Sequence, residues 1–598
     1  MEKKQSLINT IKTTKYMLSL VWNRDRLYVF FNCILGLLNS IFFVPLIIMP
    51  GLIINELTGA KNISVLLLYV STTIIIPVLN DSINIIFNKI IQKRGLKIVK
   101  DLEVDFYRHI SKLDYELLEN PNIHNMQNRS QVTLSYGALR VVDHMKSLIS
   151  GVVNLIAIFS IIMTLNVFMI VLIIIIVYVN SLVTKWLNKK KYLFEKDFSK
   201  RNRQEFVVTS TFTDIFYAKE MRLYNSSNFF IKKFIELKEL FNEQTLDNQK
   251  NDYKARLGYS AITFVQQVFL YAYLIYSILN RGLSVGSMTI YISAVSQSTS
   301  AISSLINTYM ALAKDGLSVQ DLMDFMKIPL RQYNSGDKIP IFNKKSVIEF
   351  KNVSFKYPGS QNYAIKNLNI TIYGNEKLCI VGTNGSGKST FIKLLTRLYY
   401  VTEGKILLNG VDIYEYDYEK YQRLFSVVLQ DYVLYSMSLK ENILMADEYN
   451  EKHFNEVCVK SNLTSFIDKL PKGLETQITT ALDENGIYPS GGECQRLAIA
   501  RAVYHGGEIY LLDEPTASLD PVAEQEIYTQ FNNTITDNCA ILITHRLSAV
   551  QLVDKVAVFE NGCVAEYGTH NDLYAKNGIY TEMFNKQAQF YKNSINCD

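Results

Sequence analysis

The chain has few of the residues that staple small folds or interrupt helices, with only 7 cysteines and 11 prolines among 598 residues. The cysteines are scattered singly and form no C-x-x-C pair, at positions 33, 379, 458, 494, 539, 563 and 597. This spacing favours neither a zinc site nor a disulfide framework. It is the pattern of reduced thiols in a cytosolic domain.

A strong charge of either sign is also missing. The chain has 62 Lys and Arg against 56 Asp and Glu, a net charge of +6. So small an excess on so long a chain gives no reason to expect a nucleic-acid partner. The amino-terminal M-E-K-K-Q-S is not followed by a short apolar region with a small-residue cleavage site, so we expect no cleaved signal peptide.

What the chain does have is length and apolar character. A chain of 598 residues is too long for a single core, which predicts at least two domains. Hydrophobic residues make up 48% of it, and the mean hydropathy is +0.06. This value is high for a soluble protein and low for one embedded throughout, and a membrane half joined to a soluble half produces such an average.

Long apolar runs predict that the first part of the chain, residues 1–325, is an all-α membrane domain. A transmembrane helix needs about 20 mostly apolar residues. Six segments qualify: 27–53, 63–92, 146–165, 167–187, 258–281 and 286–312. Ser, Thr, Gln and Tyr are interspersed in the last two, which must therefore turn a polar face to protein or to a water-filled cavity. A long soluble helical domain is the alternative, and the unbroken I-I-I-I run argues against it.

Basic residues predict the orientation of these spans. They concentrate after the second and fourth spans, in K-I-I-Q-K-R-G-L-K and K-W-L-N-K-K-K-Y-L-F-E-K. By the positive-inside rule these stretches face the cytoplasm, which places both termini inside the cell. Residues 93–145 and 188–257 are then long cytoplasmic helical extensions. Each has a candidate turn midway, at Tyr115 to Met126 and at Ala218 to Tyr224.

The second half of the chain contains a candidate phosphate-binding loop. After a polar linker, 326–345, residues 346–598 begin with a strand-like run and reach G-T-N-G-S-G-K-S, which matches G-x-x-x-x-G-K-[ST]. An apolar strand precedes this loop and a helix follows it, so a chance glycine loop is disfavoured. Backbone N–H groups would cradle phosphates, while Lys388 neutralises charge and Ser389 ligates Mg²⁺. The expected ATP contacts here are Gly382, Thr383, Asn384, Gly385, Ser386, Gly387, Lys388, Ser389 and Thr390.

Two acids end a second apolar run, E-I-Y-L-L-D-E-P. Carboxylates in such a place are costly unless they bind a metal or act on a substrate. We expect Asp513 to bind Mg²⁺ and Glu514 to polarise the attacking water. A strand that merely ends in a polar loop is the alternative.

The order of the phosphate loop, P-S-G-G-E at 489–493 and Y-L-L-D-E at 510–514 resembles the ATP-binding-cassette (ABC) proteins. The resemblance implies that Tyr357 stacks on adenine, that Gln430 contacts Mg²⁺ and water, and that His545 lies near the γ-phosphate. Asp520 matches the family's D-loop. An α/β P-loop ATPase domain with a helical subdomain would then follow the six-helix membrane domain.

The segment at 489–493 corresponds to the family signature, usually L-S-G-G-Q. In the family it contacts ATP held by the other subunit, so this chain would be a half-transporter that pairs with a second copy or a related half-transporter. The contacting residues would be Ser490, Gly491, Gly492 and Glu493. Pro489 replaces leucine and Glu493 replaces glutamine, and both types are tolerated at a helix start.

The two cytoplasmic turns, with E-N-P-N-I-H-N-M and K-E-M-R-L-Y, resemble the coupling helices of bacterial exporters of ribosomal peptides. The resemblance implies ATP-driven export of a small peptide through the plasma membrane of a bacterium. A multidrug or lipid exporter of the same fold is the alternative. The spans argue against a soluble ABC ATPase, and the long extensions argue against an importer. The presence of Glu514 and His545 favours a transporter that hydrolyses ATP repeatedly over an ATP-gated channel or regulator.

Overall fold

The computed structural model describes residues 7–164, 204–333, 335–514, 538–544, 550 and 553–586. The chain divides into two compact units, which are taken separately below. The first comprises Met1–Tyr107 and Met126–Met326, and the second comprises Arg108–Asn125 and Lys327–Asp598. The second unit is therefore assembled from two stretches that are far apart in the sequence. The sequence-based limits 1–325, 326–345 and 346–598 remain a prediction.

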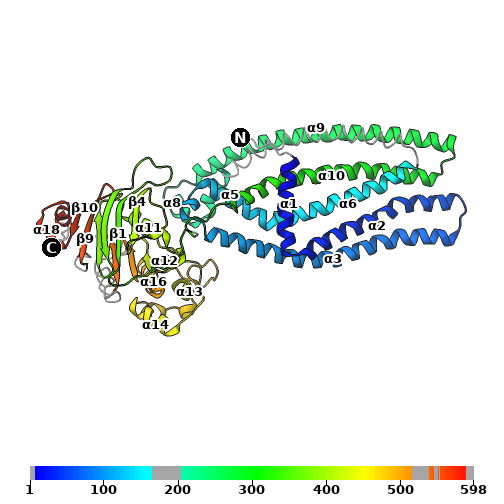
Figure 1. Ribbon diagram of the computed structural model, residues 1–598. Coiled ribbons are helices and arrows are strands. Elements are labelled where there is room, and N and C mark those ends of the chain that lie inside the picture. Colours follow the sequence, from blue (N-terminus) through cyan, green and yellow to red (C-terminus); the bar gives the residue numbers. More distant parts are fainter. Residues whose placement is uncertain are drawn as a thin grey trace. The chain divides into compact units, whose positions relative to one another are not determined.

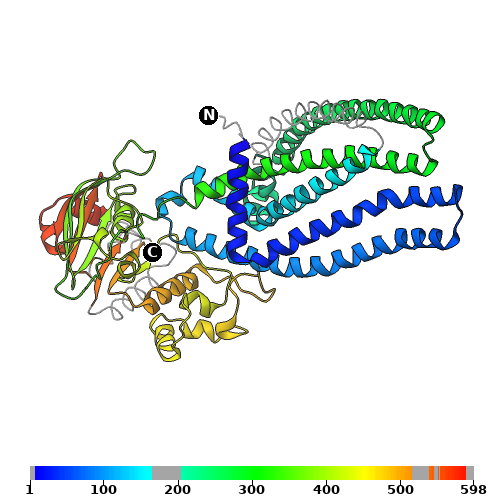
Figure 2. The ribbon, with the colours of Figure 1, turned by 45° about the vertical axis from the view of Figure 1, so that its right-hand side comes forward.

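The first unit is built of long helices that lie side by side (Figures 1 and 2). Among the described residues these are α1 (Leu7–Arg24), α2 (Arg26–Thr58), α3 (Ile63–Ser111), α5 (Pro121–Val132), η1 (Thr133–Gly137), α6 (Ala138–Met163), α8 (Ile215–Leu223), α9 (Ser227–Arg281) and α10 (Val285–Phe325). The short helix α1 lies across the others and contacts α2, α6 and α10.

Four described stretches are long and apolar enough to cross a membrane: α2, α3, the run Pro121–Met163 and α9. They contain four of the six predicted spans. The predicted span 286–312 lies in α10, which is not among the four because its Ser, Thr and Gln lower its hydropathy. The predicted span 167–187 lies outside the described residues.

Packing among these helices is mainly apolar, with a minority of buried polar side chains. Ile47, Ile158, Leu270 and Ala294 belong to one buried cluster contributed by α2, α6, α9 and α10. Between α9 and α10, Gln266 Nε2 donates to Thr299 Oγ1 at 3.2 Å, and both residues are buried. Such pairing satisfies groups that cannot face lipid.

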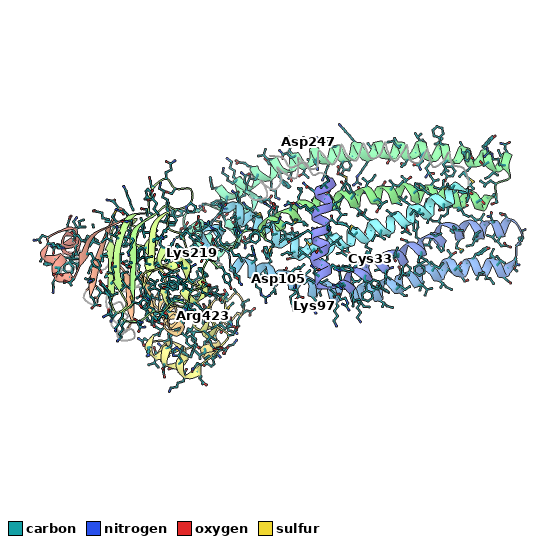
Figure 3. All side chains as sticks on the ribbon, in the orientation of Figure 1. Cys33, Lys97, Asp105, Lys219, Asp247 and Arg423 are labelled. Atoms are coloured by element: carbon teal, nitrogen blue, oxygen red, sulfur yellow. The ribbon has the colours of Figure 1, made fainter. Side chains whose placement is uncertain are left out.

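The helices α3 and α9 are longer than a bilayer requires. They contain 49 and 55 residues. At about 1.5 Å per residue each exceeds 70 Å, against roughly 30 Å of hydrocarbon. The surplus length is charged, as Figure 3 shows for Lys97 and Asp105 on α3 and for Asp247 on α9.

Two sheets form the centre of the second unit. An antiparallel sheet has the order β2-β1-β4-β5, and a six-stranded sheet has the order β10-β9-β3-β8-β7-β6. In the second sheet, β3 pairs in parallel with β8 and β9, and β7 pairs in parallel with β6 and β8. The strands are β1 (Val347–Phe355), β2 (Ile365–Tyr373), β3 (Lys377–Gly382), β4 (Glu403–Leu408), β5 (Val411–Asp412), β6 (Phe425–Val428), β7 (Ile509–Asp513), β8 (Cys539–Ile543), β9 (Lys555–Glu560) and β10 (Cys563–Gly568).

Most helices of this unit belong to one of two large cores, and the helix that contains Leu573 belongs to a smaller one. One core fills the space between the two sheets and includes Phe391 of α11 (Lys388–Leu395). The other joins β6 and β7 to a helical subdomain. Its described helices are α13 (Leu439–Leu444), α14 (Glu451–Lys460), α15 (Thr464–Ile467) and α16 (Gly491–His505). Further helices are α4 (Tyr115–Leu118), α12 (Tyr418–Gln422) and α18 (His570–Ala575).

Because the carboxyl ends of parallel strands meet at one edge, the loops after β3, β6 and β7 converge. These loops carry the phosphate-binding sequence, Gln430 and Glu514. The fold thus brings together three sites that are separated by more than 40 residues each in the chain.

Candidate functional site

The loop between β3 and α11 has the backbone of a phosphate cradle. Gly382, Gly385 and Gly387 have φ angles of 155°, 79° and 103°. At Gly382 an added Cβ would lie 2.3 Å from the carbonyl oxygen of Phe559, so only glycine fits there. The loop leads directly into the amino end of α11, where free N–H groups and the helix dipole favour an anion.

Lys388 folds back over this loop. Its Nζ donates to the carbonyl oxygens of Gly382 and Thr383, each at 3.0 Å. Burial lowers the pKa of Lys388, and the nearby carboxylates of Glu514 and Asp513 act in the opposite direction. The ammonium is therefore held inside the curve of the loop, where phosphate oxygens would compete for it.

Asp513, the last residue of β7, has the features of a cation ligand. It is 5% exposed, and its Oδ1 has no hydrogen-bond partner among the described residues. Burial raises its pKa, and a hydrogen bond from Ser389 opposes this. A buried carboxylate oxygen with free lone pairs beside a hydroxyl fits a hard cation such as Mg²⁺. The residues present thus fit the predicted metal.

Glu514 follows in a backbone conformation that is unusual for a residue with a side chain, with φ at 49°. Its N–H donates to the carbonyl oxygen of Ile543 at 3.0 Å, which fixes the turn beside β8. Its Oε2 accepts from Gln430 Nε2 at 3.1 Å. The two loops that follow β6 and β7 are thereby joined at the predicted catalytic carboxylate.

Most of these groups line one cavity of about 460 Å³, although Gly382, Thr383 and Asp513 do not. Its walls are Tyr357, Ala364, Asn384, Gly385, Gly387, Lys388, Ser389, Thr390, Gln430 and Glu514. Nine of these ten residues were predicted to contact ATP or its metal, or to catalyse its hydrolysis, and Ala364 was not. The cavity therefore joins the phosphate loop, the candidate general base and the predicted adenine-stacking ring.

Tyr357 is held firmly at the rim of this cavity. Its hydroxyl lies 3.0 Å from Thr390 Oγ1, in the first turn of α11. Its ring meets those of Phe355 and Tyr399 edge-on, with centroids 4.9 and 5.3 Å away. The ring position is thus set by protein contacts before any base stacks on it.

The signature residues begin α16 and do not line this cavity. Ser490 is the N-cap, and its hydroxyl accepts from the N–H of Glu493 at 3.4 Å. In return, Glu493 Oε2 accepts from the N–H of Ser490 at 2.7 Å. This reciprocal capping box explains how glutamate is accommodated in place of the family's glutamine. Gly491 and Gly492 follow at the exposed start of the helix.

Two predicted site residues, Asp520 and His545, lie outside the described residues. Sequence reasoning in turn missed a buried arginine, Arg397, just after α11. Its guanidinium donates to the carbonyl oxygens of Ile413, Tyr416 and Gln332 at 3.0, 2.9 and 3.1 Å. It ties the end of the phosphate-loop helix to the linker. Only its place in an aromatic run, T-R-L-Y-Y, distinguishes it in the sequence.

Fold and site together define an ATP-hydrolysing P-loop domain that shares a chain with a helical membrane domain. An ABC transporter family model matches residues 365–517. A solved bacterial Atm1-family ABC exporter with ATP bound matches 94% of this chain and 98% of its own, with a TM-score of 0.79 at 20% identity. Residues 365–517 thus form an ABC transporter ATP-binding domain, and the chain has the fold of that exporter, so the family and fold predictions are confirmed.

Two curated relatives align with nearly the whole of this chain, and a third aligns with about half of it. The subtilin transport ATP-binding protein SpaT of Bacillus subtilis is 28% identical over 590 residues, 98% of this chain and 94% of its own. The nisin transport ATP-binding protein NisT of Lactococcus lactis subsp. lactis is 26% identical, with 96% of each chain covered. The ATP-dependent lipid A-core flippase of Escherichia coli (strain K12) is 33% identical over 307 residues, about half of each chain. The chain is thus a multi-pass membrane protein that couples ATP hydrolysis to export.

Proposed function

We propose that this chain exports a small ribosomal peptide from the bacterial cytoplasm across the cell membrane, as a dimer of two copies or with a related half-transporter. The observation that carries the peptide assignment is the similarity to SpaT and NisT over nearly the entire length of all three chains. Similarity in the membrane half bears on cargo, because that half forms the path. Both termini and the ATPase domain would lie in the cytoplasm.

In this proposal the described residues divide the work at the ATP site. Tyr357 stacks on adenine, and the loop at 382–390 holds the phosphates at the start of α11. Mg²⁺ would be held by Ser389, Asp513 and Gln430, and it supplies charge neutralisation on the phosphates. Glu514 orients and polarises the attacking water, and its hydrogen bond from Gln430 keeps its carboxylate at the mouth of the cavity.

His545, as the switch histidine near the γ-phosphate, and Asp520, of the D-loop, are the remaining residues of the proposed site. The exposed start of α16 would contact the nucleotide of the second subunit through Ser490, Gly491, Gly492 and Glu493. ATP binding would then favour the closed dimer, and hydrolysis would release it, which is a population shift between two states.

ATP hydrolysis by the chain alone, in lipid vesicles, tests the dimer. Turnover that Glu514→Gln abolishes would show that one gene product forms both sites. A folded chain that binds ATP and shows no turnover, with or without peptide, would refute the homodimer.

Uptake into inside-out vesicles tests the cargo. A small ribosomal peptide should accumulate only with ATP and only with intact Glu514. The lipid flippase alternative is supported by the higher identity to the lipid A-core flippase over half the chain. ATP-dependent movement of a fluorescent lipid between leaflets, with no peptide uptake, would favour it instead.

A further inference from the structure

Beside the ATP cavity, an aromatic side chain joins the two stretches that make up the second unit. Tyr399, four residues after α11, is completely buried. Its hydroxyl donates a hydrogen bond to Glu119 Oε2, which lies 280 residues earlier in the chain. Its ring also meets the ring of Tyr115 edge-on, with centroids 5.7 Å apart. Tyr399 therefore contacts both ends of the segment Tyr115–Glu119, which contains α4.

The same ring also contacts Tyr357, which lines the nucleotide cavity. The centroids of Tyr399 and Tyr357 are 5.3 Å apart at an interplanar angle of 83°. Lys393 Nζ lies over both rings, 5.5 Å from Tyr357 and 5.8 Å from Tyr399. The energy of an edge-to-face pair depends on the distance and angle between the rings, so a shift of one ring changes the favoured position of the other.

The hydroxyl of Tyr399 is a durable donor. Burial, and then the hydrogen bond to Glu119, raise the pKa of Tyr399 far above its ordinary value. The phenol therefore stays protonated throughout the working pH range, and a carboxylate acceptor makes this hydrogen bond stronger than a neutral one.

Two further contacts anchor the segment next to Tyr115–Glu119. Asp114 Oδ1 accepts from the N–H of Gln332 at 2.9 Å, and Asp114 is buried. Lys112 Nζ lies 4.1 Å from the centroid of the Tyr333 ring. Both anchors go to residues after α10, and neither Gln332 nor Tyr333 lines the ATP cavity. The carbonyl oxygen of Gln332 also accepts from Arg397, so this anchor leads to the end of α11 and not to the adenine-stacking ring.

We propose that Tyr399 is a positioning residue that connects the adenine-stacking ring of Tyr357 to the segment Tyr115–Glu119. Its ring holds the ring of Tyr357 in place. Its hydroxyl, through the hydrogen bond to Glu119, couples movement of these rings to the segment. A base stacked on Tyr357 then tightens the segment, whereas phosphates alone do not. The inference rests on the proposed function, because it takes Tyr357 as the residue that binds adenine.

Hydrogen–deuterium exchange on the full chain in lipid nanodiscs tests this connection. Glu514→Gln is the background, so that bound ATP is not hydrolysed. Exchange at residues 115–119 is compared without ligand, with Mg-ATP, and with Mg-tripolyphosphate, which has no base. We expect Mg-ATP to slow exchange there and tripolyphosphate to leave it unchanged.

Two variants separate the ring of Tyr399 from its hydroxyl. Tyr399→Phe keeps the ring, so the Kd for ATP should stay within about twofold, while the ATP-dependent protection falls by about half or more as the bond to Glu119 is lost. Glu119→Gln weakens the same bond and should reduce protection in the same direction. Tyr399→Leu removes the ring and should raise the Kd by up to about tenfold.

Tyr421→Phe is the matched control, because Tyr421 is equally buried and its hydroxyl donates to the Leu395 carbonyl oxygen at 2.8 Å. It should leave both the Kd and the protection unchanged. Equal protection by ATP in Tyr399→Phe and in the background chain would overturn the inference, as would equal protection by tripolyphosphate. A chain that binds no ATP would refute the proposed function as well, whereas one that binds ATP without Tyr399-dependent protection refutes only the inference.

Discussion

Asp513→Asn should make the nucleotide-free protein more stable and the Mg-ATP-bound protein less stable than the original chain. Asp513 is 5% exposed, and its Oδ1 lacks a hydrogen-bond partner among the described residues. Asparagine keeps an oxygen at this place but carries no charge, so the gain comes from removing a buried negative charge. Loss of attraction to Lys388 offsets part of the gain, so we expect about 1 kcal/mol, or roughly 2–4 °C in the Tm of a domain of this size.

The pH dependence of this stability difference follows from the direction in which the pKa of Asp513 is shifted. Burial raises the pKa of Asp513 in the folded chain above its unfolded value. Stability from such a group is present below the unfolded pKa and is lost as pH rises through the folded pKa. The original chain therefore carries the penalty at pH 8 and loses it under acid conditions. The advantage of Asp513→Asn should be largest at pH 8 and shrink as pH falls.

With Mg-ATP bound, the original chain should be more stable than Asp513→Asn. A ligand at about 100 times its Kd stabilises the folded state by about 2.7 kcal/mol. The variant should lose most of this gain, because a neutral amide is a poorer Mg²⁺ ligand than a carboxylate.

Thermal unfolding by intrinsic fluorescence, with and without Mg-ATP, measures both effects. Asp468→Asn, which removes an exposed carboxylate from the helical subdomain, is the control and should change neither. A variant that is less stable than the original chain without nucleotide would refute the reasoning, because Asp513 would then be a net stabilising group in the empty site.

Three shorter predictions concern other parts of the site. Glu514→Gln should lower the ATPase kcat by about 10²-fold or more while ATP binding persists, and an equal loss of binding would contradict its role as a general base. Glu493→Ala should cost about 1 kcal/mol by opening the capping box of α16, whereas Glu493→Gln keeps an acceptor oxygen and should cost less, as urea unfolding would show. Arg397→Met should leave the carbonyl oxygens of Gln332, Ile413 and Tyr416 without their hydrogen-bond donor and destabilise the second unit by about 3 kcal/mol or more. A Tm within about 2 °C of the original would argue against this role.

The parts of the site that were predicted from sequence are those in which a function is encoded locally. The phosphate loop needs glycines at fixed spacing because its backbone must take up left-handed conformations, as at Gly385 and Gly387. Asp513 was identified because a charged residue ending a buried strand needs a reason to be there. The ABC family, the exporter fold and ATP-driven export were all confirmed, while the roles of single residues remain predictions.

The parts that were not predicted depend on contacts between distant residues. Glu119 and Tyr399 are ordinary in their local sequences, and only the fold brings them together. Arg397 is similar, because its partners come from two distant stretches of the chain, Gln332 and Ile413–Tyr416. The span 286–312 in α10 was predicted from the sequence, although its Ser, Thr and Gln make it less apolar than the four long helices.

The discontinuity of the second unit bears on how the protein is made. Residues Arg108–Asn125 leave the ribosome about 200 residues before Lys327, so at about 5–20 residues per second about 10–40 s pass before the rest of their unit begins to emerge. Throughout that interval Glu119 and Tyr115 have no Tyr399 to contact. A fragment that begins at Lys327 would lack this stretch entirely and would expose the aromatic surface that it covers. Synthesis of the membrane-inserting helices is therefore a precondition for completing the ATP-binding unit, not a separate event.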